Sequence, residues 1–107
     1  MPQYRVLVSE EAVRARRRLS DTQVRKLLWW RERLSRDPTV GDSIRKDLIP
    51  QPLRRAYDVD NLWRLELPDA WRVLYTIAAQ PGLEPEVLIL RILPHKEYDR
   101  LFGYSKS

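Results

Sequence analysis

The sequence predicts an α+β fold: an N-terminal strand, a two-helix hairpin, and an antiparallel run of three strands that forms a curved sheet with the helices on one face. Residues 9–36 carry apolar side chains at helical spacing. Residues 63–77 alternate apolar and polar side chains around a short connection, which is typical of a hairpin. Residues 87–93 are apolar on both sides, as expected of an interior strand.

The N-terminal segment predicts a strand followed directly by a helix. Tyr4 to Val8 has the composition of a short strand. Ser9 is placed to cap a helix whose first turn carries Glu10 and Glu11, where acidic side chains interact favourably with the helix dipole. Apolar residues at helical spacing continue to Leu19, so we expect this helix to end there.

A second helix is expected between Ser20 and Asp37. Ser20 and Gln23 have the spacing of a capping box, and the Asp37-Pro38 pair ends the helix. Its outer face is rich in arginine. Two interpretations explain these arginines. A solvated face with Asp21/Arg25 and Glu32/Arg36 ion pairs four residues apart is favoured over a phosphate-binding surface.

Residues 39–57 have a weaker pattern. Gly41, Pro50 and Pro52 interrupt it, and we expect a structured connection in which Ser43 to Leu48 forms one helical turn. Leu53 to Tyr57 is expected to be extended and to lead into the strand-rich half.

The hairpin alternation fixes a register. With Pro68-Asp69-Ala70 as a three-residue loop, Leu67 faces Trp71, and apolar residues pair on one side of the sheet. Glu66 then faces Arg72, and Arg64 shares their side. A two-residue loop would mix apolar and charged residues on each face, so the alternation favours the longer loop.

The last strand is expected over Val87 to Leu93, with Arg91 as the one charged residue in an apolar run. Pro94 ends the strand, and His95 to Tyr104 is expected to form a loop or a short turn-rich tail.

Size and composition favour a single domain spanning residues 1–107. A net charge of +5 and a pI near 9.9 favour a polyanionic partner, although an arginine-rich surface is also typical of heat-adapted proteins. The chain has no cysteine and no long apolar run, so we expect a cytoplasmic protein with no metal, no cofactor and no membrane association.

One group of residues suggests chemistry. His95 is the only histidine in the chain, and its imidazole titrates near neutral pH. Arg64, Arg72 and Arg91 lie on predicted strands nearby, and a cationic cluster with one titratable group suits phosphodiester chemistry. The alternatives are a structural histidine and outward arginines paired with Glu66.

In this order of elements, three segments carry a family resemblance, namely residues 61–67, the Trp71-Arg72-Val73-Leu74-Tyr75 strand, and Arg91-Ile92-Leu93-Pro94-His95-Lys96 followed by residues 99–102. Over nearly its whole length the chain resembles the RelE/ParE superfamily of small toxins from toxin–antitoxin pairs, and within it the RelE-like branch. The resemblance implies a ribosome-dependent endoribonuclease. Such enzymes bind mRNA in the ribosomal A site and promote attack of a 2′-hydroxyl on the adjacent phosphate without metal.

The resemblance also implies site residues. Arg64 and Arg72 match cations that touch the scissile phosphate, and Glu66 stands where the best-known member has lysine, so it either removes a cation or supplies a carboxylate base. His95 matches a histidine that ends the last strand, with Arg91 four residues before it, and is expected to transfer a proton. The expected RNA-binding residues are Lys96, Phe102, Tyr104, Tyr98, Arg54 and Arg55. Phe102 matches the terminal aromatic of the family, with Tyr98 and Tyr104 as substitutes.

The favoured function is therefore a toxin that cleaves mRNA on the ribosome, inhibits translation and is neutralised by a cognate antitoxin protein. Two alternatives remain open at this point. One is a ParE-like, non-enzymatic inhibitor of DNA gyrase, and the other is a non-toxic RelE-fold protein that binds RNA or a protein partner.

Overall fold

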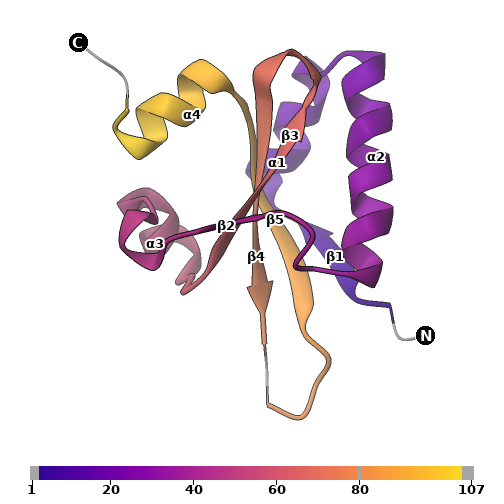
Figure 1. The fold of residues 1–107 in the computed structure, drawn as a ribbon, viewed down its shortest axis with the longest axis vertical. Coiled ribbons are helices and arrows are strands. Elements are labelled where there is room, and N and C mark those ends of the chain that lie inside the picture. The colour runs from indigo at the N-terminus through magenta and orange to yellow at the C-terminus, as the bar shows by residue number, and fades with distance from the viewer. Residues whose placement is uncertain (1–2, 80, 105–107) are drawn as a thin grey trace.

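The computed structural model describes residues 3–79 and 81–104 (Figure 1). Its strands and helices are β1 (Arg5–Val8), α1 (Glu10–Ala15), α2 (Asp21–Arg36), β2 (Asp42–Ile44), α3 (Gln51–Tyr57), β3 (Leu62–Leu67), β4 (Trp71–Ala78), β5 (Glu86–Pro94) and α4 (His95–Phe102). Short 3-10 turns occupy Arg16–Arg18, Lys46–Leu48 and Pro68–Ala70. The five strands form one sheet in the order β1-β5-β4-β3-β2. This arrangement confirms the predicted α+β class.

The predicted N-terminal elements are confirmed, together with their caps. The Ser9 hydroxyl accepts a hydrogen bond from the Ala12 amide at 3.1 Å. Ser20 and Gln23 form the capping box, with side chain and backbone bonded reciprocally at 3.2 and 2.8 Å. The first helix is shorter than expected because its last turn, Arg16–Arg18, tightens into a 3-10 turn before the next cap.

The hairpin register is also confirmed. Leu67 pairs with Trp71, Leu65 with Val73, and Glu66 with Arg72. The three-residue connection turns the chain through positive φ at Asp69 (64°) and Ala70 (60°). β5 lies inside the sheet, antiparallel to β4 and parallel to β1.

Three segments have a different structure from the one expected. Residues 53–57 belong to helix α3 rather than an extended segment, because proline is compatible with the first turn of a helix and Leu53 is fully buried against the sheet. The residues after Pro94 form helix α4 rather than a loop. The predicted turn over Ser43 to Leu48 is split into the edge strand β2 and the 3-10 turn.

Helices lie on both faces of the sheet. Figure 1 shows the sheet nearly edge-on, with α2 on one side and α3 and α4 on the other. One core joins the hairpin helices to residues such as Leu34, Val73 and Tyr75. A second core joins α3 and α4 to the opposite face through Leu74 and Tyr98. The hairpin helices occupy one face as predicted, but the second layer was not expected from the sequence.

In the described ranges, no helix combines the length and the apolar character that a membrane span requires.

Candidate functional site

Three arginines share the face of the sheet that α3 and α4 cover. Arg64 of β3 and Arg91 of β5 both pair with Leu74 of β4, one on each side. Arg72 of β4 lies two register pairs further, opposite Glu66. Because directly paired residues project to the same face of a sheet, the three guanidinium groups lie on one side of the molecule. The register confirms the predicted shared side of Arg64 and Arg72, and it adds Arg91 to them.

A β-bulge places Arg91 on this face. The β4–β5 ladder shifts between Leu74 and Tyr75, so that Tyr75 pairs with Ile89, Leu74 pairs with Arg91, and Leu90 is left without a direct partner. Without the extra residue, strict alternation from Ile89 would point Arg91 into the core beneath the hairpin helices. The bulge therefore directs the third arginine toward the other two.

The three arginines have unsatisfied donors. Their side chains are only 33%, 20% and 27% exposed for Arg64, Arg72 and Arg91. Across the described ranges, the buried side-chain nitrogen and oxygen atoms that lack a hydrogen-bond partner are the Nε atoms of these same three residues. Arg91 Nε lies 3.0 Å from a Glu11 carboxylate oxygen, as an ion pair without the alignment of a hydrogen bond. Buried donors without acceptors are costly, so this face is suited to an anion that would accept from them.

Tyr98 of α4 lies over two of the arginines. Arg64 Nη1 donates to the Tyr98 hydroxyl at 3.4 Å. The guanidinium carbons of Arg64 and Arg72 lie 5.9 and 5.7 Å from the centre of its ring. The hydrogen bond with Tyr98 is the main reason that the pKa of Arg64 is raised, so this group stays charged at any physiological pH. Among the described residues, Tyr98 is the one whose hydroxyl is hydrogen-bonded to one of the three arginines.

The geometry of α4 explains the position of Tyr98. Tyr98 and Phe102 are four residues apart and project to the same side of the helix, where their rings stack at 4.4 Å. Tyr104 stacks on Phe102 at 5.7 Å and is exposed. Of the three tail aromatics proposed from the sequence, Tyr98 is the one that contacts the arginines.

The carboxylates near the arginines are weak counterions. Glu66 lies 3.5 Å from Arg72, and Asp42 lies 3.5 Å from Arg64. Both carboxylate side chains are largely exposed, at 62% and 72%, so solvent screens them. The face therefore keeps a positive charge, and Glu66 lies at its solvent side.

His95 does not join the arginines in this structure. It is exposed in the first turn of α4, and its side chain makes no hydrogen bond or ion pair with any other described residue. Lys96 beside it is exposed as well. The role expected for His95 therefore stays a prediction.

Arg54 and Arg55 lie on α3. Arg54 donates to the carbonyl oxygens of Ile49, at 3.3 Å, and Lys46, and so holds the preceding 3-10 turn. Arg55 is exposed. Neither forms a hydrogen bond or an ion pair with the three arginines in the described ranges, so a structural role explains Arg54.

The arrangement suits a phosphate group. Guanidinium donors with no acceptor would bind its oxygens, and a phenol hydroxyl held beside one of them is able to transfer a proton. Sequence reasoning missed the position of Tyr98 because it expected a loop there. The signal that would have shown it is the Tyr98, Leu101, Phe102 spacing, which is that of one helix face.

A solved structure has a fold similar to that of this chain. No protein-family model matches the chain, and no curated protein sequence matches it. Among solved structures, a chain of the crystal structure of the archaeal RelE–RelB complex from Pyrococcus horikoshii OT3 is similar, with 24% sequence identity and a TM-score of 0.58. The match covers 86% of this chain and 94% of that chain. The fold is thus RelE-like, as the sequence resemblance implied.

Proposed function

We propose that this chain is the toxin of a toxin–antitoxin pair and acts in the cytoplasm as an endoribonuclease on mRNA bound to the ribosome. The main support is that three arginines lie on one face with buried Nε atoms that make no hydrogen bond, and that the Tyr98 hydroxyl is bonded to Arg64. The RelE-like fold agrees with this proposal.

The proposed reaction needs no atom beyond the RNA and the protein. The 2′-hydroxyl attacks the adjacent phosphorus, the bond from phosphorus to the 5′-oxygen breaks, and the products are a 2′,3′-cyclic phosphate and a 5′-hydroxyl. Arg64, Arg72 and Arg91 stabilise the charge that develops on the phosphoryl oxygens. Tyr98 donates its proton to the leaving 5′-oxygen, and Arg64 stabilises the phenolate. His95, which lies one helical turn before Tyr98, is assigned the role of the general base that accepts the proton of the 2′-hydroxyl.

The proposed protein partner is an antitoxin. The similar archaeal structure is a complex of RelE with RelB. For this chain, we propose that an antitoxin segment covers the arginine face and supplies carboxylates to Arg64, Arg72 and Arg91. Carboxylate oxygens match a guanidinium group in the same bidentate way as phosphate oxygens.

An induction experiment tests the proposal. The chain is expressed from a tightly repressed promoter, and the 5′ ends of cellular mRNAs are mapped within minutes. We expect new 5′ ends inside translated reading frames, and none after expression of Arg72→Ala. Arg25→Ala is the matched control, because it removes an exposed arginine from α2 and should cut normally.

A different outcome would identify the alternative. A DNA-damage response with intact mRNA would overturn the nuclease proposal and favour a gyrase inhibitor. Normal growth with intact mRNA at high expression would favour the non-toxic binding protein.

A further inference from the structure

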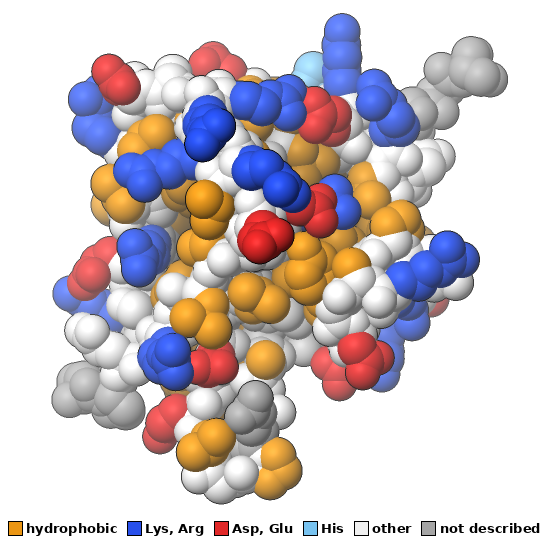
Figure 2. Space-filling view, turned by 180° about the vertical axis from the view of Figure 1, so that it is seen from behind, with side chains coloured by type: hydrophobic (Ala, Val, Ile, Leu, Met, Phe, Trp, Pro, Cys, Tyr) orange, Lys and Arg blue, Asp and Glu red, His pale blue; other side chains and the backbone are white. Residues whose placement is uncertain are grey.

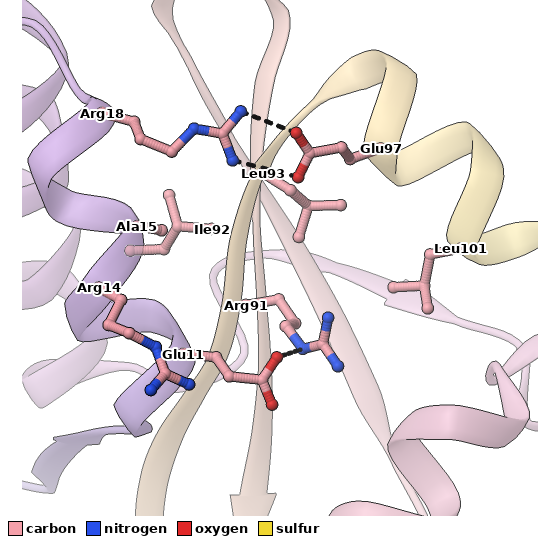
Figure 3. Close-up of a pocket in the computed structure, with 9 residues that line it drawn as sticks. All are labelled: Glu11, Arg14, Ala15, Arg18, Arg91, Ile92, Leu93, Glu97 and Leu101. Atoms are coloured by element: carbon pink, nitrogen blue, oxygen red, sulfur yellow. Dashed lines mark hydrogen bonds and ion pairs between the residues drawn. The ribbon is translucent and has the colours of Figure 1, made fainter.

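A cavity of about 310 Å³ lies beside the arginine face, between α1, β5 and α4 (Figure 3). Its charged lining residues are Glu11, Arg14, Arg18, Arg91 and Glu97. Leucine and isoleucine side chains of β5 and α4 form its apolar wall. Arg91 belongs both to this cavity and to the arginine face, so the two are continuous.

The cavity exists because α1 replaces a strand at the edge of β5. Strand β1 ends at Val8, and Ser9 then bonds to β5 through its amide, which donates to the Ile89 carbonyl at 2.9 Å, and its hydroxyl, which donates to the Leu90 carbonyl at 2.6 Å. The helix that follows runs beside the last residues of β5. Arg14 of α1 and Arg18 of the following 3-10 turn both line the cavity.

Two of the guanidinium groups in the cavity are paired with carboxylates of the protein itself. Arg18 donates two hydrogen bonds to Glu97 of α4, at 3.2 and 2.7 Å, and Arg91 lies 3.0 Å from Glu11 of α1 (Figure 3). The hydrogen bond with Arg18 lowers the pKa of Glu97, so the carboxylate stays charged at neutral pH. The Arg18 and Glu97 side chains are 52% and 39% exposed, which leaves the pair open to a competing anion.

We propose that this cavity is a second phosphate subsite, in which Arg14, Arg18 and Arg91 bind the phosphate that neighbours the scissile one. Glu11 and Glu97 hold the arginines in the free protein and are displaced when the phosphate binds. The inference rests on the proposed function and extends it, because it gives the RNA strand a path across the sheet. Along that path Arg64, Arg72 and Arg91 come from three adjacent strands, followed by Arg18 next to α1.

Binding of a non-cleavable RNA tests this subsite. The probe is a short oligonucleotide with 2′-O-methyl groups, so no hydroxyl attacks, and its affinity for the full chain is measured by fluorescence anisotropy. We expect Glu97→Gln to bind about fivefold more tightly, because the competing carboxylate is gone and the shape of the side chain is kept. We expect Arg18→Ala to bind several-fold more weakly.

Two controls separate this subsite from general charge effects. Glu84→Gln changes the net charge equally at an exposed site in the β4–β5 connection and should change affinity much less than Glu97→Gln. Replacing the neighbouring phosphate of the probe by an uncharged methylphosphonate should abolish the increase in affinity that Glu97→Gln causes.

The outcomes also separate this inference from the proposed function. If Glu97→Gln changes the affinity for the probe no more than Glu84→Gln does, or binds the probe more weakly than the unchanged protein, the proposal of a second subsite is wrong. If Arg72→Ala weakens binding in that case, the arginine face still binds RNA and only the inference fails. If Glu97→Gln strengthens binding and Arg72→Ala has no effect, the cavity binds phosphate and the assignment of the arginine face fails.

Discussion

Tyr98 and His95 stand one turn apart on α4 but have different surroundings. Tyr98 is 6% exposed and bonded to Arg64, whereas His95 is exposed and has no bonded partner among the described residues. At the residue scale, the contacts of Tyr98 support its proposed role in proton transfer more directly than those of His95 support its own.

We predict that Tyr98→Phe lowers the single-turnover rate of mRNA cleavage by roughly 100-fold or more, which is the scale of a lost general acid. The change keeps the ring that packs on Phe102. Tyr104→Phe, a change of the same kind at an exposed ring, should leave the rate unaltered. Equal rates for Tyr98→Phe and the unchanged protein would show that Tyr98 is not the general acid. His95→Ala, measured in the same series, tests the separate proton transfer from the 2′-hydroxyl.

We also predict that Arg72→Met abolishes cleavage without loss of stability. Arg72 is 20% exposed, and its Nε lacks an acceptor, so a methionine of similar length removes an unsatisfied donor while keeping apolar packing. Thermal unfolding followed by circular dichroism should give an unchanged or slightly higher melting temperature. A large drop, compared with the exposed Arg55→Met control, would show that Arg72 is there for stability rather than for binding.

Residue types and alternation alone predict the placement of Arg64 and Arg72. They do not predict the face on which Arg91 lies. A bulge decides the face of every residue that follows it, and a strand that is apolar on both sides gives no sign of where a bulge occurs. The ion pairs of Glu11 and Glu97 join residues far apart in the chain and depend on how α1 and α4 pack, which no local pattern shows.

At the scale of elements, short helices were the hardest to predict. α3 and α4 have only seven and eight residues, and isolated helices of that length are marginal, so packing against the sheet decides their conformation. Caps and loop length, by contrast, are encoded locally, which is why Ser9, Ser20 and the Pro68-Asp69-Ala70 connection were predicted correctly.

Tyr75 ties β4 to the segment between α2 and β2. Its hydroxyl donates to the Pro38 carbonyl at 2.7 Å and accepts from the Gly41 amide at 3.0 Å. A side chain at Gly41 would not fit, since its Cβ would lie 2.7 Å from that hydroxyl and 2.8 Å from the Arg64 carbonyl. This contact fixes β2 beside Arg64 and so supports one edge of the site.

Burial raises the pKa of Tyr75 to about 12, which predicts a change of stability with pH. The folded state keeps the phenol proton at a pH where the unfolded chain has lost it. The stabilisation is therefore complete below about pH 10 and falls as pH rises toward 12, by roughly 2 to 3 kcal/mol.

Denaturant unfolding between pH 8 and pH 12 measures this effect. Tyr75→Phe should cost about 1 to 3 kcal/mol at pH 8, because two hydrogen bonds are lost, and should flatten the alkaline decline. An equally steep decline in Tyr75→Phe would mean that another group is responsible.

At the scale of the whole molecule, positive charge is present on more than the arginine face. Figure 2, which shows the molecule from behind, has Lys and Arg side chains gathered mainly in the upper part of this face, with carboxylates between them. The predicted Glu32/Arg36 pair is present at 2.7 Å, whereas no Asp21/Arg25 pair is found in the described ranges. The solvated interpretation of α2 therefore holds only in part, and its cations add to a general attraction for polyanions.

We predict that RNA affinity falls steeply with salt. The slope of log K, the association constant, against the logarithm of the salt concentration is about −0.7 for each phosphate neutralised on a single strand. Contacts to about three phosphates therefore give a slope near −2. Anisotropy titrations of the 2′-O-methyl probe at several potassium chloride concentrations measure it. Arg72→Ala should reduce the slope, and a slope near zero would contradict an electrostatic arginine face.

The most direct test of the central claim, that the arginine face cleaves RNA through its 2′-hydroxyl, is a cleavage assay on ribosomes programmed with a defined mRNA. The mRNA is compared with a copy that carries one deoxyribose at the cleaved position. We predict a 2′,3′-cyclic phosphate on the unmodified product, no cleavage of the deoxy-substituted copy, and no cleavage of either by Arg72→Ala. Cleavage of the deoxy-substituted copy, or full activity of Arg72→Ala, would contradict the account.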